Sequence, residues 1–287
     1  MPSEDHEREP ASRHDPGAHR PLIELIDLHK SFGSQRVLEG VNLNFRQGQT
    51  TVVLGQSGSG KSVILKHIAG LLRPDSGEIR YDSLRIDHLP ERDLTPMRKE
   101  MGFLFQLSAL FDSMTIAENL EFPLIEHSRL SPEERRERIK DVLAVVDLAG
   151  VELKHPAQLS GGQQRRAALA RAIIQRPRLM LYDEPTTGLD PIRAAGISDL
   201  IMKLKNETGM TGIVVTHDLA CMRKVADRVV MLHDGRIIAD GTPDELASSE
   251  DPHVQHFITG TAEAELDRFR NESLLGPPPS AHRGARA

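Results

Sequence analysis

A glycine-rich segment at residues 55–62 carries residue types that bind phosphate groups. It reads Gly55-Gln56-Ser57-Gly58-Ser59-Gly60-Lys61-Ser62 and matches the pattern G-x-x-x-x-G-K-[ST]. Glycines allow successive backbone N–H groups to converge on phosphate oxygens, and a helix N-terminus directly after them adds partial positive charge. We expect Lys61 to reach the β- and γ-phosphates of a nucleotide and Ser62 to bind Mg²⁺. A chance Gly/Ser loop is the alternative, and the strand-to-helix context disfavours it.

A second segment ends in two carboxylates. The apolar run Leu179-Met180-Leu181-Tyr182 is followed by Asp183 and Glu184. A strand that ends in this way places Asp183 where it can hold a metal ion, and Glu184 where it can polarise an attacking water. Either acid alone would be a solvated strand end. Together with the phosphate-binding loop, the pair indicates hydrolysis as well as binding.

A third segment, Leu159-Ser160-Gly161-Gly162-Gln163, precedes the helix-forming run 164–174. It forms a second helix N-terminus with exposed N–H groups, and therefore a second anion site. Two such helix ends far apart in one chain suggest a nucleotide shared between two subunits. We therefore predict a dimer in which Ser160, Gly161, Gly162 and Gln163 serve the nucleotide held by the partner.

The elements that must position these segments follow from hydrophobic periodicity. Residues 22–28 and 41–45 are predicted to be strands, the second with strict alternation, and residues 50–54 form a continuous β-branched run typical of a buried parallel strand. A helix is expected from about Lys61, with one apolar face that includes Ile64, Leu65, Ile68, Leu71 and Leu72.

The middle of the chain has helical signals. Ser131-Pro132-Glu133-Glu134 is a strong helix start, and helical spacing dominates from there to about residue 175. Strands resume at 179–182, 213–216 and 229–232. The last of these pairs with 236–239 across Asp234-Gly235, a strong hairpin turn. These signals predict an α/β fold in which a βα core is interrupted by a mostly helical insertion.

Composition sets limits on the class of protein. The chain has 287 residues, a formal net charge of -6 and one cysteine, Cys221. The net charge argues against a dedicated nucleic-acid binder, so no nucleic-acid partner is expected. A single cysteine allows no intramolecular disulfide and suits a reducing compartment. We expect Cys221 to serve packing, and no apolar run is long enough for a membrane-spanning helix.

Taken together, these motifs resemble those of ABC-type ATPases over residues 22–260. The resemblance implies a P-loop NTPase (RecA-like) core with an antiparallel β subdomain and an inserted helical subdomain at about 107–175, and it implies ATP and Mg²⁺ as cofactors. The domain is expected to span residues 21–260. We expect a disordered tail at 1–20 and a C-terminal extension at 261–287 that begins with a weakly amphipathic helix and is partly disordered.

The resemblance also assigns roles at matching positions. It implies that Phe32 stacks on adenine, although a buried core phenylalanine is the alternative. It implies that Gln106 senses the γ-phosphate and Mg²⁺, that Asp190 in Gly188-Leu189-Asp190 contacts the opposite subunit, and that His217 contacts the γ-phosphate. Taken alone, His217 would be a structural residue.

Non-transport members of the family fit less well. Chromosome and DNA-repair ATPases separate the two phosphate motifs by long coiled coils, and this chain shows no sustained heptads. Translation-factor relatives carry two ATPase domains in one chain, and this chain has one. A transporter subunit paired with a separate membrane-spanning permease fits best. The ATPase motifs say little about the cargo, so an importer or exporter of some other solute than the lipid considered below stays open as an alternative.

Residues 102–124 resemble the ATPases of Mla-type lipid transporters. This segment holds Phe103, Phe105, Phe111 and Phe122, which belong either to the core alone or also to a groove for a membrane subunit. Val63, the run 165–172 and the run 253–260 agree with this likeness. It implies phospholipid movement between membranes, powered from the cytoplasmic face of the inner membrane, with a permease, an MCE protein and often a small STAS-domain subunit. Val63 is thereby added to the nucleotide-binding residues.

Overall fold

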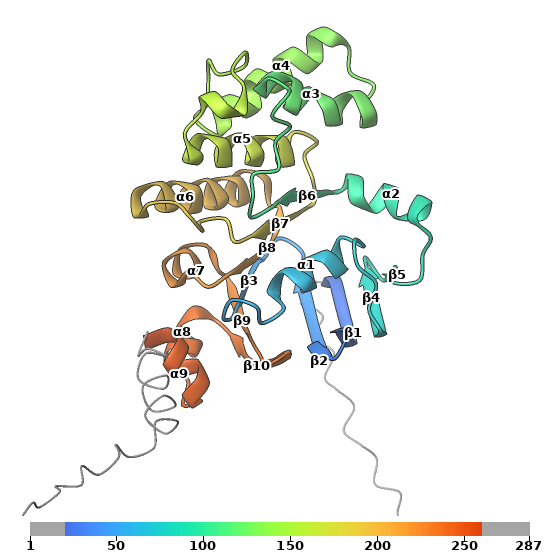
Figure 1. The fold of residues 1–287 in the computed structure, drawn as a ribbon, viewed down its shortest axis with the longest axis vertical. Coiled ribbons are helices and arrows are strands. Elements are labelled where there is room, and N and C mark those ends of the chain that lie inside the picture. Colours follow the sequence, from blue (N-terminus) through green and yellow to red (C-terminus); the bar gives the residue numbers. More distant parts are fainter. Residues whose placement is uncertain (1–20, 260–287) are drawn as a thin grey trace, which may run out of the picture.

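The computed structural model describes residues 21–259, and the predictions for residues 1–20 and 260–287 lie outside them. The described chain forms two sheets and a set of helices that are arranged in layers (Figure 1). Among residues 21–259, no helix has both the length and the apolar character needed to cross a bilayer.

The central sheet has six strands in the order β10-β9-β3-β8-β7-β6. Strands β3, β6, β7, β8 and β9 run parallel, and β10 pairs antiparallel with β9. Their bounds are Thr50–Leu54 (β3), Met101–Leu104 (β6), Leu179–Asp183 (β7), Thr211–Thr216 (β8), Arg228–His233 (β9) and Arg236–Gly241 (β10). Every residue of β3, β7 and β8 is buried, as expected when both faces of a parallel sheet are covered.

A second, antiparallel sheet has the order β2-β1-β4-β5. It consists of Pro21–Phe32 (β1), Gln35–Arg46 (β2), Ser76–Tyr81 (β4) and Leu84–Arg85 (β5). In β2 the buried residues Val41, Leu43 and Phe45 alternate with exposed asparagines, which confirms the alternation predicted from the sequence.

Two core clusters divide the structure because successive strand residues point to opposite faces of the central sheet. Val53 and Ile213 pack with the antiparallel sheet and with α1 (Lys61–Ile68) and α2 (Glu91–Lys99). Val52 and Val214 pack on the other side. The helices there are α3 (Ile116–His127), α4 (Pro132–Val145), α5 (Gly161–Ile173), α6 (Pro191–Thr208), α7 (Leu219–Val225), α8 (Pro243–Ala247) and α9 (Pro252–Thr259).

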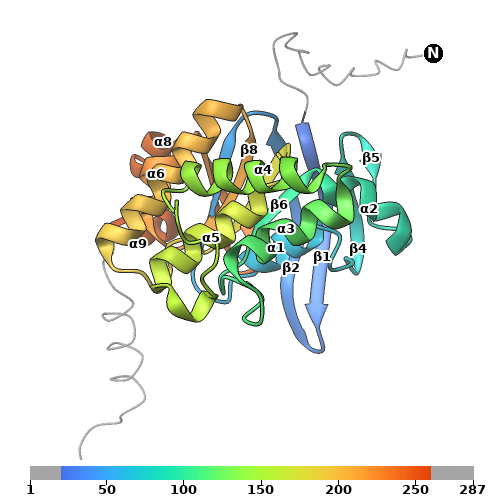
Figure 2. The same cartoon turned by 90° about the horizontal axis from the view of Figure 1, so that it is seen from above.

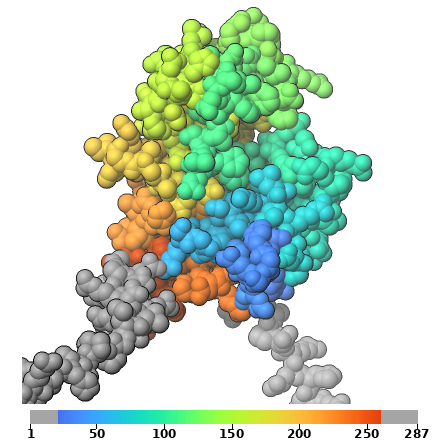
Figure 3. Space-filling view, in the orientation of Figure 1, coloured from blue at the N-terminus to red at the C-terminus, as the bar shows by residue number. Residues whose placement is uncertain are grey.

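Helices α3 and α4 lie at the end of the molecule farthest from α8 and α9, and α5 lies beneath them (Figures 1 and 2). In the space-filling view the residues of these helices form the upper end of the molecule (Figure 3). A short 3₁₀ turn at Pro156–Gln158 leads into α5. Helix α4 begins at Pro132 with a capping box between Ser131 and Glu134, which confirms the predicted helix start.

Two other local predictions can be compared with the structure. The hairpin between β9 and β10 is confirmed: Asp234 and Gly235 have φ values of 44° and 73°, as a type I′ turn requires. The apolar face predicted for the first helix was wrong at its end, because α1 stops at Ile68 and Leu71 is 54% exposed. Gly70 adopts φ 67°, and the Leu71 N–H bonds back to the Lys66 carbonyl, which terminates the helix.

Asn119 organises the loop that connects β6 to α3. Its side chain is fully buried, accepts a hydrogen bond from the Phe111 N–H and donates to the carbonyls of Phe111, Met114 and Thr115. One amide therefore contacts four backbone groups, and two of them, the Phe111 N–H and the Met114 carbonyl, have no other hydrogen-bond partner among the described residues.

Replacing Asn119 with Ala is expected to lower the free energy of unfolding by about 2–4 kcal/mol, because it leaves the Phe111 N–H and the Met114 carbonyl without a partner and removes a fully buried side chain. Urea unfolding of the full chain measures this change. Asn206→Ala on the exposed face of α6 is the matched control and should change stability little. Equal stabilities for the two variants would contradict the organising role of Asn119.

Candidate active site

A cavity of about 450 Å³ lies beside the carboxyl ends of β3, β7 and β8, where ligands bind in open α/β sheets. Many of the residues singled out in the sequence line it, although they come from distant segments. The lining comprises Phe32, Val37, Ser57, Gly58, Gly60, Lys61, Ser62, Val63, Gln106, Glu184, Thr187 and His217.

The loop before α1 needs its glycines for two different reasons. Gly58 and Gly60 have φ values of 82° and 103°, which side chains rarely tolerate. At Gly55 a Cβ would lie 2.5 Å from the Leu232 carbonyl oxygen, so the backbone packs too closely for any other residue. Ser59 Oγ is buried and has no hydrogen-bond partner within residues 21–259.

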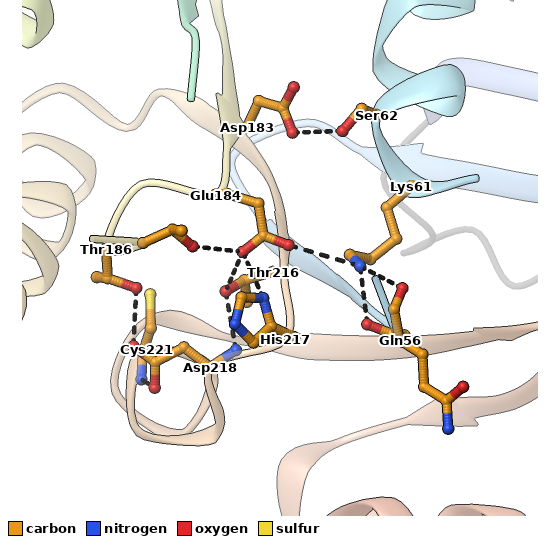
Figure 4. Close-up of polar contacts among 12 residues, drawn as sticks. Gln56, Lys61, Ser62, Asp183, Glu184, Thr186, Thr216, His217, Asp218 and Cys221 are labelled. Carbon is orange, nitrogen blue, oxygen red and sulfur yellow. Dashed lines mark hydrogen bonds and ion pairs between the residues drawn. The ribbon is translucent and has the colours of Figure 1, made fainter. Parts of the chain in front are cut away.

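Lys61 is buried, with 5% of its surface exposed, and its ammonium group lies inside the loop. It donates to the carbonyl oxygens of Gly55 and Gln56, each at 2.8 Å, and lies 3.5 Å from Glu184 Oε1 (Figure 4). Burial lowers the pKa of Lys61, and the Glu184 carboxylate opposes this shift. When a nucleotide binds, the ammonium group can therefore exchange these two carbonyl oxygens for phosphate oxygens.

Ser62 and Asp183 meet although they are 121 residues apart in the chain. Ser62 Oγ donates to Asp183 Oδ1 at 2.7 Å. Burial raises the pKa of Asp183, and the hydrogen bond from Ser62 opposes that shift. A hydroxyl and a carboxylate are ligands that Mg²⁺ accepts, so this pair fits a magnesium site.

Glu184 is held by side chains from several segments. Its Oε2 lies 2.9 Å from His217 Nδ1, and it accepts hydrogen bonds from the hydroxyls of Thr187 at 3.1 Å and Thr216 at 3.3 Å (Figure 4). Its backbone has φ 48°, a conformation that costs energy in a residue with a side chain. These contacts fix one carboxylate at the cavity wall, where a water molecule could be polarised.

Phe32 and Gln106 occupy the rim. Phe32 is 49% exposed, which rules out the alternative of a core phenylalanine, and Lys30 Nζ lies 5.5 Å from its ring centre. Gln106 follows β6 and lines the cavity. An exposed aromatic face at the mouth suits stacking of a nucleobase.

The Ser160–Gln163 segment does not line this cavity. Ser160 caps α5 by accepting from the Gln163 N–H, and Gln163 Oε1 accepts from the Ser160 N–H. A Cβ at Gly162 would lie 3.0 Å from the Arg193 side chain, so this glycine lies beside the start of α6. Asp190 caps α6 and lies 3.2 Å from Arg193, which places it beside this segment.

Sequence reasoning missed several contributors. Val37 and Thr187 line the cavity, Thr216 binds Glu184, and Thr186 donates to Asp218 at 2.7 Å. The threonines stand in or beside motifs that were recognised, but their partners are far away in the sequence. Cys221 lies nearby and is 2% exposed, which confirms the packing role predicted for it. Burial raises the pKa of its thiol to about 11.

Comparison with known proteins agrees with this geometry. Residues 38–187 match the family model described as ABC transporter. The chain is 42% identical over 238 residues to the probable ribonucleotide transport ATP-binding protein mkl of Mycobacterium tuberculosis, covering 83% of this chain and 66% of the relative. It is 39% identical over 249 residues to the intermembrane phospholipid transport system ATP-binding protein MlaF of Haemophilus influenzae, covering 87% of this chain and 94% of the relative.

A solved structure shows the same fold. It is the dimeric post-hydrolysis state of an ATP-binding cassette bound to ADP and Pi, with a TM-score of 0.72, 37% sequence identity and coverage of 77% of this chain and 98% of that chain. The chain therefore belongs to the ABC transporter family and has the expected ABC ATPase fold. Within that family it resembles the ATP-binding protein MlaF of an intermembrane phospholipid transport system.

Proposed function

We propose that this chain hydrolyses ATP as a homodimer and thereby drives phospholipid transport between membranes. The observation that carries the catalytic part is the convergence of Lys61, Glu184, Gln106 and His217 on one cavity. In this arrangement the loop 55–62 binds the phosphates, Lys61 binds the β- and γ-phosphates, Phe32 stacks on the base and Val63 lines the site.

Mg²⁺ would be held by Ser62, Asp183 and Gln106, whose oxygens suit it. When bound, it neutralises charge that develops on the phosphates. Glu184 would accept a proton from the attacking water, with its carboxylate oriented by Thr187, Thr216 and His217. His217 would also contact the γ-phosphate.

The dimer is supported by the position of the Ser160–Gln163 segment, which does not line the chain's own cavity. Ser160 and Gly161 are exposed at the N-terminus of α5, away from the chain's own phosphate loop. A second copy would bring this helix end to the nucleotide of the first, with Asp190 at the contact, so that each nucleotide has two half-sites.

The transport role is supported by exposed apolar side chains that follow Gln106 in the chain. Leu107, Phe111, Phe122 and Ile125 are each at least 44% exposed, and Phe111 and Phe122 pack edge to face with ring centres 5.6 Å apart. Such a patch suits a helix of a membrane permease at the cytoplasmic face of the inner membrane. An MCE protein and a STAS-domain subunit, which the resemblance to Mla-type lipid transporters implies, complete the proposed assembly; the name of the relative MlaF supports the phospholipid cargo.

Cargo can be tested with the chain reconstituted with its permease and MCE protein between two vesicle populations. ATP-dependent transfer of a labelled phospholipid is expected, and Glu184→Gln should abolish it. Movement of ribonucleotides instead, as the name of the mycobacterial relative suggests, would overturn the lipid assignment without affecting the ATPase assignment.

Asp183→Asn is expected to stabilise the nucleotide-free chain while abolishing magnesium-dependent hydrolysis. The raised pKa of Asp183 means that the folded chain holds this proton more tightly than the unfolded chain, so its contribution to stability falls as pH rises through that range. At neutral pH the Asn variant avoids burying the charge, and its melting temperature should rise by about 2–4 °C. Thermal unfolding measures this, with the exposed Asp141→Asn on α4 as the control. A lower melting temperature for Asp183→Asn would contradict the burial argument.

A further inference from the structure

Arg165, on the second turn of α5, is a buried cation whose position needs an explanation. It is 5% exposed, and within residues 21–259 Lys61 is the only other buried lysine or arginine. Across the same residues no carboxylate lies within ion-pair distance of Arg165. Burial lowers the pKa of Arg165, and the more distant Asp183 opposes that shift. Burying a guanidinium without a paired acid is costly, so its hydrogen bonds must matter.

Those hydrogen bonds go to two loops of the candidate active site. The Nη1 group donates to the Phe105 carbonyl at 2.7 Å, and the Nη2 group donates to the Thr187 carbonyl at 3.3 Å. Phe105 directly precedes Gln106, and Thr187 lies between Glu184 and Asp190. The guanidinium is a rigid planar fork, so it holds the two carbonyls at a set spacing.

Thr187 links Arg165 to Glu184, the proposed general base. Thr187 accepts from Arg165 through its carbonyl, while its hydroxyl donates to Glu184 Oε2 at 3.1 Å. Arg165 itself lies two residues after Gln163, on the helix whose N-terminus would face the partner's nucleotide. Helix α5 also packs against β6 and α6, from which these loops extend (Figure 1).

The neighbouring Arg166 shows what a purely structural arginine looks like on the same helix. It donates to the Val146 carbonyl and to Asp147 Oδ2 at 2.7 Å, and its side chain is 25% exposed. It connects α5 to the end of α4, and the hydrogen bonds that it makes within residues 21–259 reach no residue that lines the cavity. The two arginines lie on the same helix and carry the same charge, but Arg165 binds loops of the candidate active site and Arg166 binds the end of α4.

We propose that Arg165 is a positioning residue. It couples the loop that holds Gln106 and the loop from Glu184 to Asp190 to the N-terminus of α5, where Ser160–Gln163 lie. A shift of either loop on ATP binding would be passed through the fork to the helix end that meets the partner's nucleotide. The inference rests on the proposed ATP-driven dimer and adds the link between its two half-sites.

The test compares Arg165→Met and Arg165→Lys with Arg166→Met in the full chain. Arg165→Met should lower kcat for ATP hydrolysis by roughly 10- to 100-fold through misplacement of the loops, with ATP affinity within about threefold of wild type. Arg165→Lys keeps the charge but not the fork, so it should recover part of kcat. Arg166→Met should keep wild-type kcat even if its melting temperature falls.

Dimer formation gives a second readout that does not depend on hydrolysis. In a Glu184→Gln background, ATP should convert the chain to a dimer in size-exclusion chromatography, and adding Arg165→Met should weaken this conversion while adding Arg166→Met should not. If Arg165→Met does not fold, the kcat and the ATP-induced dimerisation of the Arg165→Lys variant decide whether Arg165 has the coupling role.

Two results would overturn the coupling role. One is wild-type kcat and dimerisation in a folded Arg165 variant; the other is an equal loss of both in the Arg166 control. A wild-type chain that binds ATP without hydrolysing it would contradict the proposed function instead, and the dimerisation measurement would still decide the role of Arg165.

Discussion

Glu184→Gln should bind ATP normally and hydrolyse it at least about 100-fold more slowly than wild type, because a general base contributes 10²–10⁴-fold. The substitution keeps the size of the side chain and one oxygen that can accept from Thr187 and Thr216. It removes the negative charge that would take the proton from water. Lys61, 3.5 Å away, keeps its two carbonyl partners, so the phosphate-binding loop should stay formed.

Phosphate release and ATP binding should be measured on the same preparation, since only their difference identifies a base. The ATP-bound variant should accumulate as a stable dimer, because closure is no longer followed by hydrolysis. Glu207→Gln, an exposed substitution on α6, is the matched control and should leave turnover unchanged. Hydrolysis at the wild-type rate by Glu184→Gln would show that another group activates the water.

Lys61→Met should weaken ATP binding by roughly 100-fold, because a charge-assisted hydrogen bond contributes about 1.5–3 kcal/mol. The ammonium group of Lys61 is buried and already holds the loop through Gly55 and Gln56. Methionine fills a similar volume but offers no donor to phosphate oxygens. The loss should therefore appear in the dissociation constant for ATP as well as in turnover.

Calorimetric titration with ATP and Mg²⁺ measures this constant, and Lys140→Met on the exposed face of α4 controls for the loss of one positive charge. The two variants should differ in the quantity that changes most: Lys61→Met loses ATP affinity, whereas Glu184→Gln keeps ATP affinity and loses turnover. Tight ATP binding by Lys61→Met would place the phosphates elsewhere than in the loop 55–62.

Much of the molecule was readable from the sequence where the determining residues are neighbours in the chain. The loop 55–62, the acids at 183–184 and the turn at Asp234-Gly235 each depend on residues within a few positions, and the structure builds β3, α1, β7 and the β9–β10 hairpin around them. The resemblance to ABC ATPases placed Phe32, Gln106 and His217, and the structure brings all three to one cavity. Periodicity failed at the end of α1, because a left-handed Gly70 ended the helix before Leu71.

The sequence by itself determined the chemistry, since phosphate binding and hydrolysis require particular residue types at short, fixed spacings. Only the tertiary structure decided which distant groups meet. It set Ser62 against Asp183 across 121 residues, surrounded Glu184 with Thr187, Thr216 and His217, and gave the buried Arg165 two loop carbonyls as partners. The reason is physical: a hydrogen bond depends on distance in space, and the packing of the sheet and α5 sets that distance for residues that the chain keeps far apart.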